Sequence, residues 1–294
     1  MANQTPQPTL TLLADLVSEL RADAQAAYDA RQSGLPRGPQ TGLSSLDEAL
    51  GGFLAPGLHV LQAAPGAGKT AWGLQTAASC SFPALFVSAE MPTLELFRRL
   101  IARHTKTFLG KFKSGELPPN EVERLALNTA KAMPDLALLD GTRGYASPSV
   151  IHDAAEGLRE KCDAQNLMVI VDSLQMWARS GRGAAGGMMT DYDAINASLG
   201  VAAEIAAESR CPLVLIAHRN RAGQDKGGMH AAKGSGDIEY AVETLIDLEP
   251  EKDARPDQNG EIGVTARLVK NRHGIAGASV SLKFSGRLQE FRTV

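Results

Sequence analysis

Residues 63–70 have the types and the order that hold phosphate groups. The run reads Ala-Ala-Pro-Gly-Ala-Gly-Lys-Thr, and its glycines free the backbone so that consecutive N–H groups can point into one concavity at a helix N-terminus. Lys69 would reach the β- and γ-phosphates of a nucleotide, and the Thr70 hydroxyl can ligate Mg²⁺. The run therefore predicts a P-loop for ATP and Mg²⁺, although Ala63 stands where glycine is usual. The residues that we expect to contact the nucleotide are Ala64, Pro65, Gly66, Ala67, Gly68, Lys69, Thr70 and Ala71.

Two carboxylates follow apolar runs and would complete the chemistry of such a site. The apolar residues 168–171 precede Asp172, and this pattern is typical of a buried strand whose final carboxylate holds Mg²⁺. Glu90 follows the apolar run 84–89, so it would lie at the carboxyl end of a strand and could orient the attacking water. Each has a plainer interpretation, since Asp172 could cap the next turn and Glu90 could be an acidic charge at the start of a helix.

The elements that must position these residues alternate along the chain. Short β-rich runs at 59–63, 84–88, 136–139, 167–172 and 212–217 are separated by longer helical stretches, which predicts an α/β fold with a mainly parallel, twisted sheet flanked by helices. The later runs 245–249, 261–270 and 278–284 predict one more strand and a C-terminal β-hairpin.

An N-terminal helix precedes this core. Apolar residues between Leu10 and Ala27 recur every three or four positions, and the Gly- and Pro-rich stretch 32–40 reads as a linker. We expect two parts: residues 1–35, a helix and linker that dock on a neighbouring subunit, and residues 36–294, the core.

Composition excludes some classes of protein. The formal net charge of −3 over 294 residues means that contact with nucleic acid needs a local basic surface. Three cysteines without CxxC spacing favour a reducing compartment, and no apolar run approaches the roughly 18 residues that span a bilayer. We expect a cytoplasmic protein. Two glycine-rich, mildly basic stretches, 179–190 and 221–236, could be plain solvated loops.

Seven segments, in order along most of the chain, resemble the RecA-like ATPase domain of DnaB-type replicative helicases, including compact plasmid-encoded members without the large N-terminal domain. They are 41–47 (Thr-Gly-Leu and Leu-Asp), 63–70, 88–92 (Ser-Ala-Glu-Met-Pro), 172–175 (Asp-Ser-Leu-Gln), 218–221 (His-Arg-Asn-Arg), 234–239 (Gly-Ser-Gly-Asp-Ile-Glu) and 270–274 (Lys-Asn-Arg-His-Gly). The resemblance implies a RecA-like P-loop NTPase fold.

The resemblance also implies a role for each matching residue of the nucleotide site. Lys69 would bind phosphate, Glu90 would polarise water, and Asp172 would be the Walker B aspartate. His218 stands where these helicases usually carry a glutamine that senses the γ-phosphate, and its charge can change near neutral pH. A satisfied histidine at a strand end is the plainer interpretation of His218.

Two further features of the resemblance concern assembly and DNA. Arg272, with Lys270, would reach the γ-phosphate of a neighbouring subunit as an arginine finger, and this role requires an oligomer. The plainer interpretation is that the charged run 270–273 is a solvated face of the hairpin. The glycine-rich stretches would form central-channel loops of a hexameric ring that grip single-stranded DNA. The channel residues that we expect are Arg179, Arg182, Arg221, Lys226 and Lys233.

The leading hypothesis is a hexameric, ATP-driven helicase that moves 5′→3′ on single-stranded DNA during replication, with a replication initiator or loader as candidate partner. One alternative is a recombinase-like or KaiC-like ATPase that forms filaments or regulates. Another is a non-catalytic nucleotide-binding adaptor or loader. Retention of Glu90, Asp172 and Arg272 together argues against the non-catalytic class.

Overall fold

The structure is a computed structural model that describes residues 10–184, 186, 189–219, 241–251 and 255–294. The chain divides into two compact units, Met1–Arg37 and Gly38–Val294. The division falls inside the Gly- and Pro-rich stretch 32–40. In the described residues, no helix has the length and apolar character needed to cross a membrane.

The N-terminal unit is a short 3₁₀ turn, η1 (Leu13–Leu16), followed by helix α1 (Val17–Ser33). The helix ends at Gly34, whose left-handed φ of 69° lets its N–H donate to the carbonyl of Ala30. None of the residues of η1 and α1 is buried, and Leu13 and Leu20 are 85% and 69% exposed. The predicted helix therefore exists, but its regular part begins at Val17 rather than at the start of the apolar stripe.

The second unit is built on one sheet, in which the described strands follow the order β3-β2-β4-β5-β1-β6-β7-β8-β9. The strands from β3 to β6 in that order are parallel, and β7, β8 and β9 add to them as an antiparallel extension. Their bounds are β1 (Gly57–Ala63), β2 (Ala84–Ser88), β3 (Leu136–Asp140), β4 (Met168–Asp172), β5 (Pro212–His218), β6 (Thr244–Pro250), β7 (Glu261–Asn271), β8 (Ser279–Ser285) and β9 (Glu290–Thr293).

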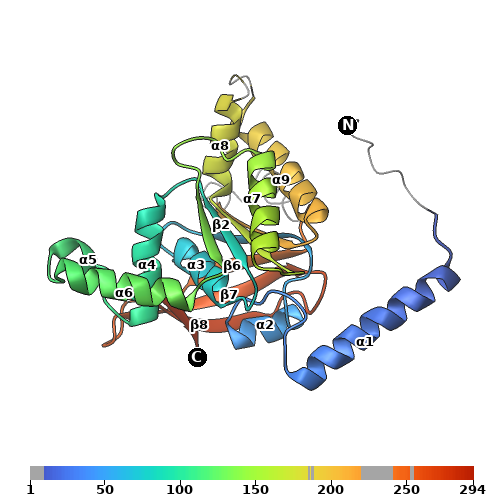
Figure 1. The fold of residues 1–294 in the computed structure, drawn as a ribbon, viewed down its shortest axis with the longest axis horizontal. Coiled ribbons are helices and arrows are strands. Elements are labelled where there is room, and N and C mark those ends of the chain that lie inside the picture. Colours follow the sequence, from blue (N-terminus) through green and yellow to red (C-terminus); the bar gives the residue numbers. More distant parts are fainter. Residues whose placement is uncertain (1–9, 185, 187–188, 220–240, 252–254) are drawn as a thin grey trace. The chain divides into compact units, whose positions relative to one another are not determined.

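Helices cover the sheet, and the side chains of its central strands alternate between two cores. The helices are α2 (Ser44–Leu50), α3 (Lys69–Ser79), α4 (Thr93–Thr105), α5 (Lys111–Ser114), α6 (Pro119–Ala132), α7 (Pro148–Lys161), α8 (Leu174–Ala184) and α9 (Asp191–Glu208). Phe86 packs with Trp72 of α3 and Leu96 of α4. Its neighbours Leu85 and Val87 belong to the core formed with α7, α8 and α9, which Figure 1 shows gathered together.

This architecture confirms the predicted α/β fold with a mainly parallel sheet. Two local predictions differ from it. Strand β9 was not predicted, because it has four residues and only Phe291 among them is buried. Residues 179–184 were expected in a loop but continue helix α8. Gly181 lies inside this helix and needs no turn conformation. A Cβ there would come within 2.9 Å of the Tyr145 hydroxyl, so close packing explains the glycine.

Candidate active site

The predicted P-loop joins the carboxyl end of β1 to the first residue of α3. Gly66 and Gly68 have left-handed φ angles of +81° and +87°, which fold the loop into a concavity at the helix N-terminus. A Cβ on Gly68 would lie 2.9 Å from the rings of Phe284 and Phe291, so only glycine fits there. A Cβ on Gly66 would meet nothing within 4 Å, so it is the positive φ, and not close packing, that favours glycine there. The helix begins at Lys69, directly after Gly68.

Lys69 lies at the centre of this concavity. Its Nζ donates hydrogen bonds to the carbonyl oxygens of Ala63, at 3.1 Å, and Ala64, at 2.9 Å. Burial lowers the pKa of Lys69, while the charges of Asp172 and Glu90 oppose that shift. The ammonium group is thus held where the phosphates of a nucleotide would enter the loop.

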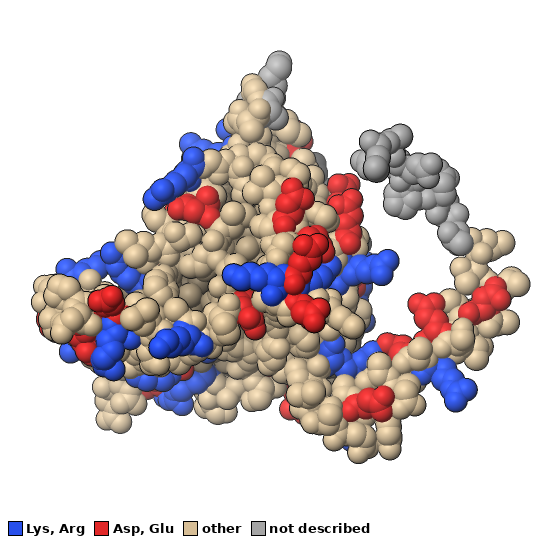
Figure 2. Space-filling model, in the orientation of Figure 1, with Lys and Arg blue, Asp and Glu red and all other residues tan. Residues whose placement is uncertain are grey.

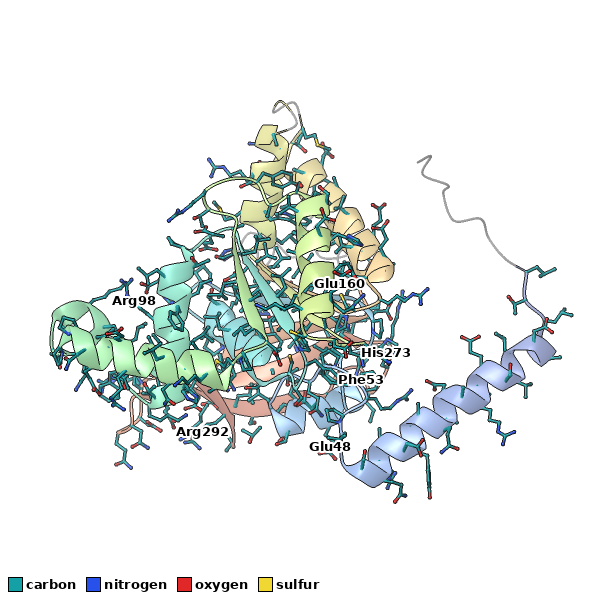
Figure 3. All side chains as sticks on the ribbon, viewed as in Figure 1. Glu48, Phe53, Arg98, Glu160, His273 and Arg292 are labelled. Carbon is teal, nitrogen blue, oxygen red and sulfur yellow. The ribbon has the colours of Figure 1, made fainter. Side chains whose placement is uncertain are left out.

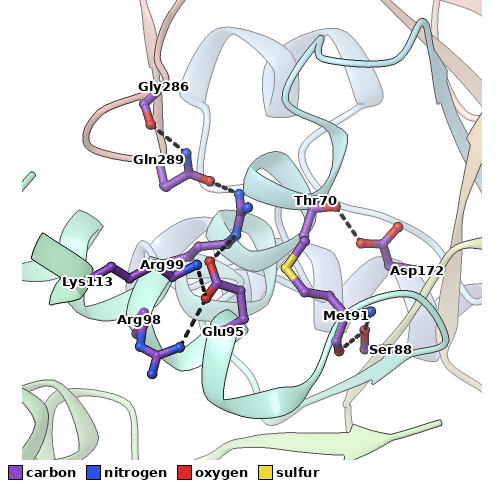
Figure 4. Close-up of polar contacts among 10 residues, drawn as sticks. All are labelled: Thr70, Ser88, Met91, Glu95, Arg98, Arg99, Lys113, Asp172, Gly286 and Gln289. Carbon is purple, nitrogen blue, oxygen red and sulfur yellow. Dashed lines mark hydrogen bonds and ion pairs between the residues drawn. The ribbon is translucent and has the colours of Figure 1, made fainter. Parts of the chain in front are cut away.

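Thr70 and Asp172 provide two adjacent oxygens of the kind that Mg²⁺ prefers. The Thr70 hydroxyl donates to Oδ2 of Asp172 over 2.6 Å, as drawn in Figure 4. Burial is the main cause that raises the pKa of Asp172 to about 6, against the effect of the hydrogen bond from Thr70. Mg²⁺ takes one or two protein oxygens together with phosphate oxygens and water, so these residues fit the ion that ATP would bring.

Glu90 and His218 lie beside each other at the same edge of the sheet, with 3.5 Å between Oε2 of Glu90 and Nε2 of His218. The turn that carries Glu90 is fixed by Ser88, whose hydroxyl donates to the carbonyl of Met91 over 2.7 Å and accepts from its N–H over 3.0 Å. The structure therefore brings the predicted water-orienting residue and the predicted sensor together. Ser88 lies in one of the family segments, but no pattern in the sequence predicts that it fixes this turn.

Gln175 holds the main chain of His218. Its side-chain oxygen accepts from the His218 N–H at 3.1 Å, and its amide nitrogen donates to the His218 carbonyl at 3.3 Å. The N–H and the carbonyl of His218, at the end of β5, are thus both bonded to the first turn of α8. This role was also missed, since it depends on the order of strands in the sheet.

Arg99 lines the same cleft, which has a volume of about 380 Å³ and also contains Lys69, Glu90, Asp172 and His218. Figure 4 shows how the guanidinium is held: it donates to the side-chain oxygen of Gln289, whose amide nitrogen donates to the Gly286 carbonyl. Its Nε lies 3.9 Å from Glu95, which also pairs with Arg98 and Lys113. No motif marks Arg99 in the sequence, and only the fold places α4 beside the P-loop.

Arg272 and Lys270 lie away from the nucleotide cleft, at the end of the sheet where the parallel strands begin. We call this end the amino edge, and the end where the parallel strands finish the carboxyl edge. Asn271, between them, pairs with Thr244, which in turn pairs with His59 near the start of β1, whereas the P-loop follows the end of β1. The four steps along β1 from His59 to Ala63 span about 13 Å. Figure 3 shows His273 and Arg98 on opposite sides of the core. The structure therefore does not bring the predicted finger to the nucleotide cleft of its own chain.

The candidate DNA residues are only partly described. Arg179 is exposed on α8, and Arg182 donates to Asp191 over 2.6 Å. Arg221, Lys226 and Lys233 lie outside the described residues. On the face drawn in Figure 2, basic and acidic side chains of the core are mixed rather than gathered in one basic field.

Residues 38–293 match the DnaB-like helicase C terminal domain family. The chain is similar to the replicative DNA helicase DnaB of Treponema pallidum (strain Nichols), with 27% identity over 300 residues that cover 99% of this chain and 64% of that protein. It is also similar to the DNA repair protein RadA of Mycobacterium tuberculosis (strain ATCC 25618 / H37Rv), with 28% identity over 255 residues that cover 85% of this chain and 42% of that protein.

Among solved structures, the fold is similar to that of a DnaB-like replicative helicase, with a TM-score of 0.73 and 19% identity over 96% of this chain and 72% of that one. The chain spans about three fifths of the length of the curated DnaB relatives that it matches. The fold is therefore RecA-like. Because the family match extends over most of its length, the chain belongs to the DnaB-like helicase C-terminal domain family.

Proposed function

We propose that the protein is an ATP-driven helicase that assembles as a hexameric ring and moves 5′→3′ along single-stranded DNA during replication. The observation that carries the proposal is the separation of functional groups between two edges of one sheet. Lys69, Asp172 and Glu90 share one cleft, but the basic residue expected to complete it, Arg272, extends from the opposite edge. A complete site therefore needs two chains, as a ring supplies.

Each residue of the cleft has a task in this proposal. The P-loop concavity and Lys69 bind the phosphates of ATP. Thr70 and Asp172 would hold Mg²⁺, which would neutralise part of the phosphate charge. Glu90 orients the attacking water and accepts its proton. His218, next to Glu90, donates one hydrogen bond to the γ-phosphate and reports its presence.

Arg272 of the neighbouring chain would stabilise the charge that develops on the transferred phosphoryl group. Such a finger contributes on the order of 10³–10⁵ in rate. Lys270, the residue before the last in β7, would support it electrostatically.

The channel of the ring would carry the DNA contacts. We propose that Arg179 and Arg182 on α8, together with Arg221, Lys226 and Lys233, bind the phosphates of single-stranded DNA. A ring brings the same residues of every subunit together, so a chain with a net charge of −3 can still line a basic channel. DNA binding should weaken steeply as salt rises.

Residues 1–35 would dock on a neighbouring subunit, and residues 36–294 form the catalytic core. Exposed Leu13, Leu20 and other apolar residues of the N-terminal unit support this proposal, because such side chains are usually covered in the assembled state. A chain that begins at residue 38 should form rings only at higher concentration, which mass measurement tests. The three free cysteines agree with a cytoplasmic location, and a replication initiator or loader is the proposed partner in assembly.

The central test mixes two inactive rings. Arg272→Ala leaves every cleft without a finger, and Glu90→Gln leaves every cleft without its water-orienting group. After subunit exchange, an intact Glu90 will meet an intact Arg272 at some interfaces, so ATP hydrolysis should exceed that of either ring alone. Arg292→Ala, which removes an ion-paired surface arginine of β9, is the matched control and should keep wild-type turnover. No gain after demonstrated exchange would contradict a site shared between chains.

The similarity to the RadA protein favours one alternative, a recombinase-like or KaiC-like ATPase. Such a protein would form open filaments or would hydrolyse ATP without stimulation by DNA. Mass measurement of the assembly and ATPase assays with and without single-stranded DNA separate these cases. A nucleotide-binding adaptor would show no turnover in either assay.

A further inference from the structure

We propose that Glu243 is a positioning residue for Arg272, and that it therefore acts on the active site of the neighbouring chain and not on its own. The inference rests on the proposed role of Arg272 as a finger. Glu243 lies just before β6, beside the amino end of β1, and belongs to none of the segments that revealed the family.

Glu243 contacts Arg272 through both main chain and side chain. The Arg272 N–H donates to the Glu243 carbonyl over 3.0 Å, and its Nη1 donates to Oε1 of Glu243 over 3.1 Å. The second carboxylate oxygen lies 3.1 Å from Nε2 of His273. One residue thus holds two consecutive side chains of the turn after β7.

The carboxylate is itself held in place. The Glu243 N–H donates to the Leu58 carbonyl over 2.8 Å, and the side chain is 23% exposed. It packs over Gly57, where a Cβ would come within 2.7 Å of the Glu243 Cγ. An exposed ion pair between two mobile side chains contributes little, but here the acidic partner is fixed by the start of β1.

The main chain of the turn is anchored separately, by α2. The Asn271 side chain donates to the Ala49 carbonyl over 3.1 Å and accepts from the His273 N–H over 3.2 Å. A Cβ on Gly51 would lie 2.8 Å from the His273 carbonyl, so the helix end also packs directly on the turn. With the main chain fixed in this way, Glu243 determines the direction of the guanidinium.

The direction matters because Arg272 is 52% exposed and a guanidinium carries five N–H donors. Some N–H groups of the guanidinium can keep their contact with Glu243 while others donate to a phosphate oxygen of the next chain. A displacement of about 1 Å in such a group can reduce turnover on the order of 100-fold. We therefore expect loss of Glu243 to lower kcat without weakening nucleotide binding, since the cleft of the same chain lies at the other edge of the sheet.

The test uses the full chain with Glu243→Ala, Glu243→Met and Glu243→Gln. Alanine and methionine should each lower kcat by about 10- to 100-fold and leave the KM for ATP within about twofold, and glutamine should restore most of kcat because it keeps an acceptor for Arg272. Methionine retains the packing over Gly57, so it decides the matter if the alanine variant does not fold. Glu261→Gln, which changes an ion-paired glutamate of β7, is the matched control and should behave as wild type.

Mixed rings assign the defect to one side of the interface. Glu243→Ala mixed with Glu90→Gln should regain activity, whereas Glu243→Ala mixed with Arg272→Ala should not, because the finger is defective in both. If Arg272→Ala and Glu90→Gln fail to complement each other, the shared site is wrong and the proposed function falls. If they do complement each other, two outcomes would contradict the role of Glu243 and leave the proposed function standing. One is a wild-type kcat in a folded Glu243→Ala or Glu243→Met variant. The other is recovery of activity when Glu243→Ala is mixed with Arg272→Ala.

Discussion

The two edges of the parallel sheet hold their functional groups in different ways. At the carboxyl edge the groups contact one another: Thr70 hydrogen-bonds to Asp172 over 2.6 Å, and Glu90 lies 3.5 Å from His218. At the amino edge, Arg272 contacts Glu243, a carboxylate outside the cleft. The carboxyl edge is thus suited to bind a ligand within one chain, whereas we propose that the amino edge presents Arg272 to a neighbouring chain.

The buried titratable groups at the two edges have pKa values that are shifted in opposite directions. Asp172 is 2% exposed, and burial raises its pKa to about 6. His59, near the amino edge, is 1% exposed, and burial lowers its pKa to about 4. Burial disfavours the charged form of both groups. Binding a proton neutralises Asp172 but gives His59 a charge, so acidification has opposite effects on them.

The largest expected effect tests the carboxyl edge. Lys69→Ala removes the one ammonium group that faces the P-loop concavity among the described residues of the cleft. ATP turnover should fall to less than about one thousandth of wild type, with loss of tight nucleotide binding, because the phosphates lose their positive partner. Binding of a fluorescent ATP analogue measures this directly.

The contrast between the edges sharpens that prediction. Arg272→Ala should keep nucleotide binding although it also abolishes turnover, and Lys283→Ala, which removes a surface lysine paired with Asp257, should change neither. If Lys69→Ala and Arg272→Ala lost nucleotide binding to the same degree, the claim that only the carboxyl edge binds the nucleotide would be wrong.

Much of the fold was predictable, because β2 and β4 are buried along their whole length and therefore read as unbroken apolar runs. The P-loop was predictable for a different reason: its backbone geometry needs glycines at fixed positions. The sequence could not show that Gly181 packs against Tyr145 within a helix, since that contact joins residues far apart in the chain.

The site was predictable only where a motif carries it. Ser88 and Gln175 orient their neighbours through hydrogen bonds to main-chain groups, which leave no spacing pattern. That Arg272 lies at the opposite edge from the P-loop depends on β7 running antiparallel to β6, and strand direction is a property of the assembled sheet. The family segments make Arg272 a candidate finger, but they do not predict at which edge of the sheet it lies.

The next effect concerns stability and pH. In the nucleotide-free protein, the folded state binds a proton at Asp172 more tightly than the unfolded state does, so this group adds stability as pH falls from about 6 towards 4. His59 does the reverse: between pH 6.5 and about 4 the unfolded state binds the proton, and stability is lost on acidification. Each effect amounts to about 3 kcal/mol at its full extent, and in the wild type they oppose each other.

Two variants separate these contributions. His59→Gln keeps a donor for the Ala55 carbonyl, the partner of the His59 ring at 2.8 Å, and should make the protein gain stability as pH falls from 6.5 to 4.5. Asp172→Asn should make it lose stability over the same interval. The measurement is the free energy of unfolding in urea at several pH values, with EDTA and without nucleotide. Equal pH dependence in wild type and His59→Gln would mean that the histidine does not stay neutral in the folded protein.

The smallest expected effect concerns Gln175, which links the carboxyl edge to α8 within one chain. Its amide contacts both the N–H and the carbonyl of His218, and Arg179, a candidate DNA contact, follows one turn later on the same helix. Gln175→Ala should therefore leave basal hydrolysis and nucleotide affinity within about twofold of wild type, but should reduce stimulation by single-stranded DNA about tenfold, which corresponds to roughly 1.4 kcal/mol. ATPase assays over a range of DNA concentrations measure this.

The control for Gln175 is Gln40→Ala, because Gln40 also donates from its side chain to a main-chain carbonyl, that of Gly52, at 2.8 Å, but lies outside the cleft. Gln40→Ala should keep full stimulation. Since His218 serves the cleft of its own chain in the proposed mechanism, Gln175→Ala should recover stimulation when mixed with Arg272→Ala and should not recover when mixed with Glu90→Gln. Recovery with Glu90→Gln alone would place the effect of Gln175 on the neighbouring chain, and the carboxyl edge would then act across the interface, as the amino edge is proposed to do.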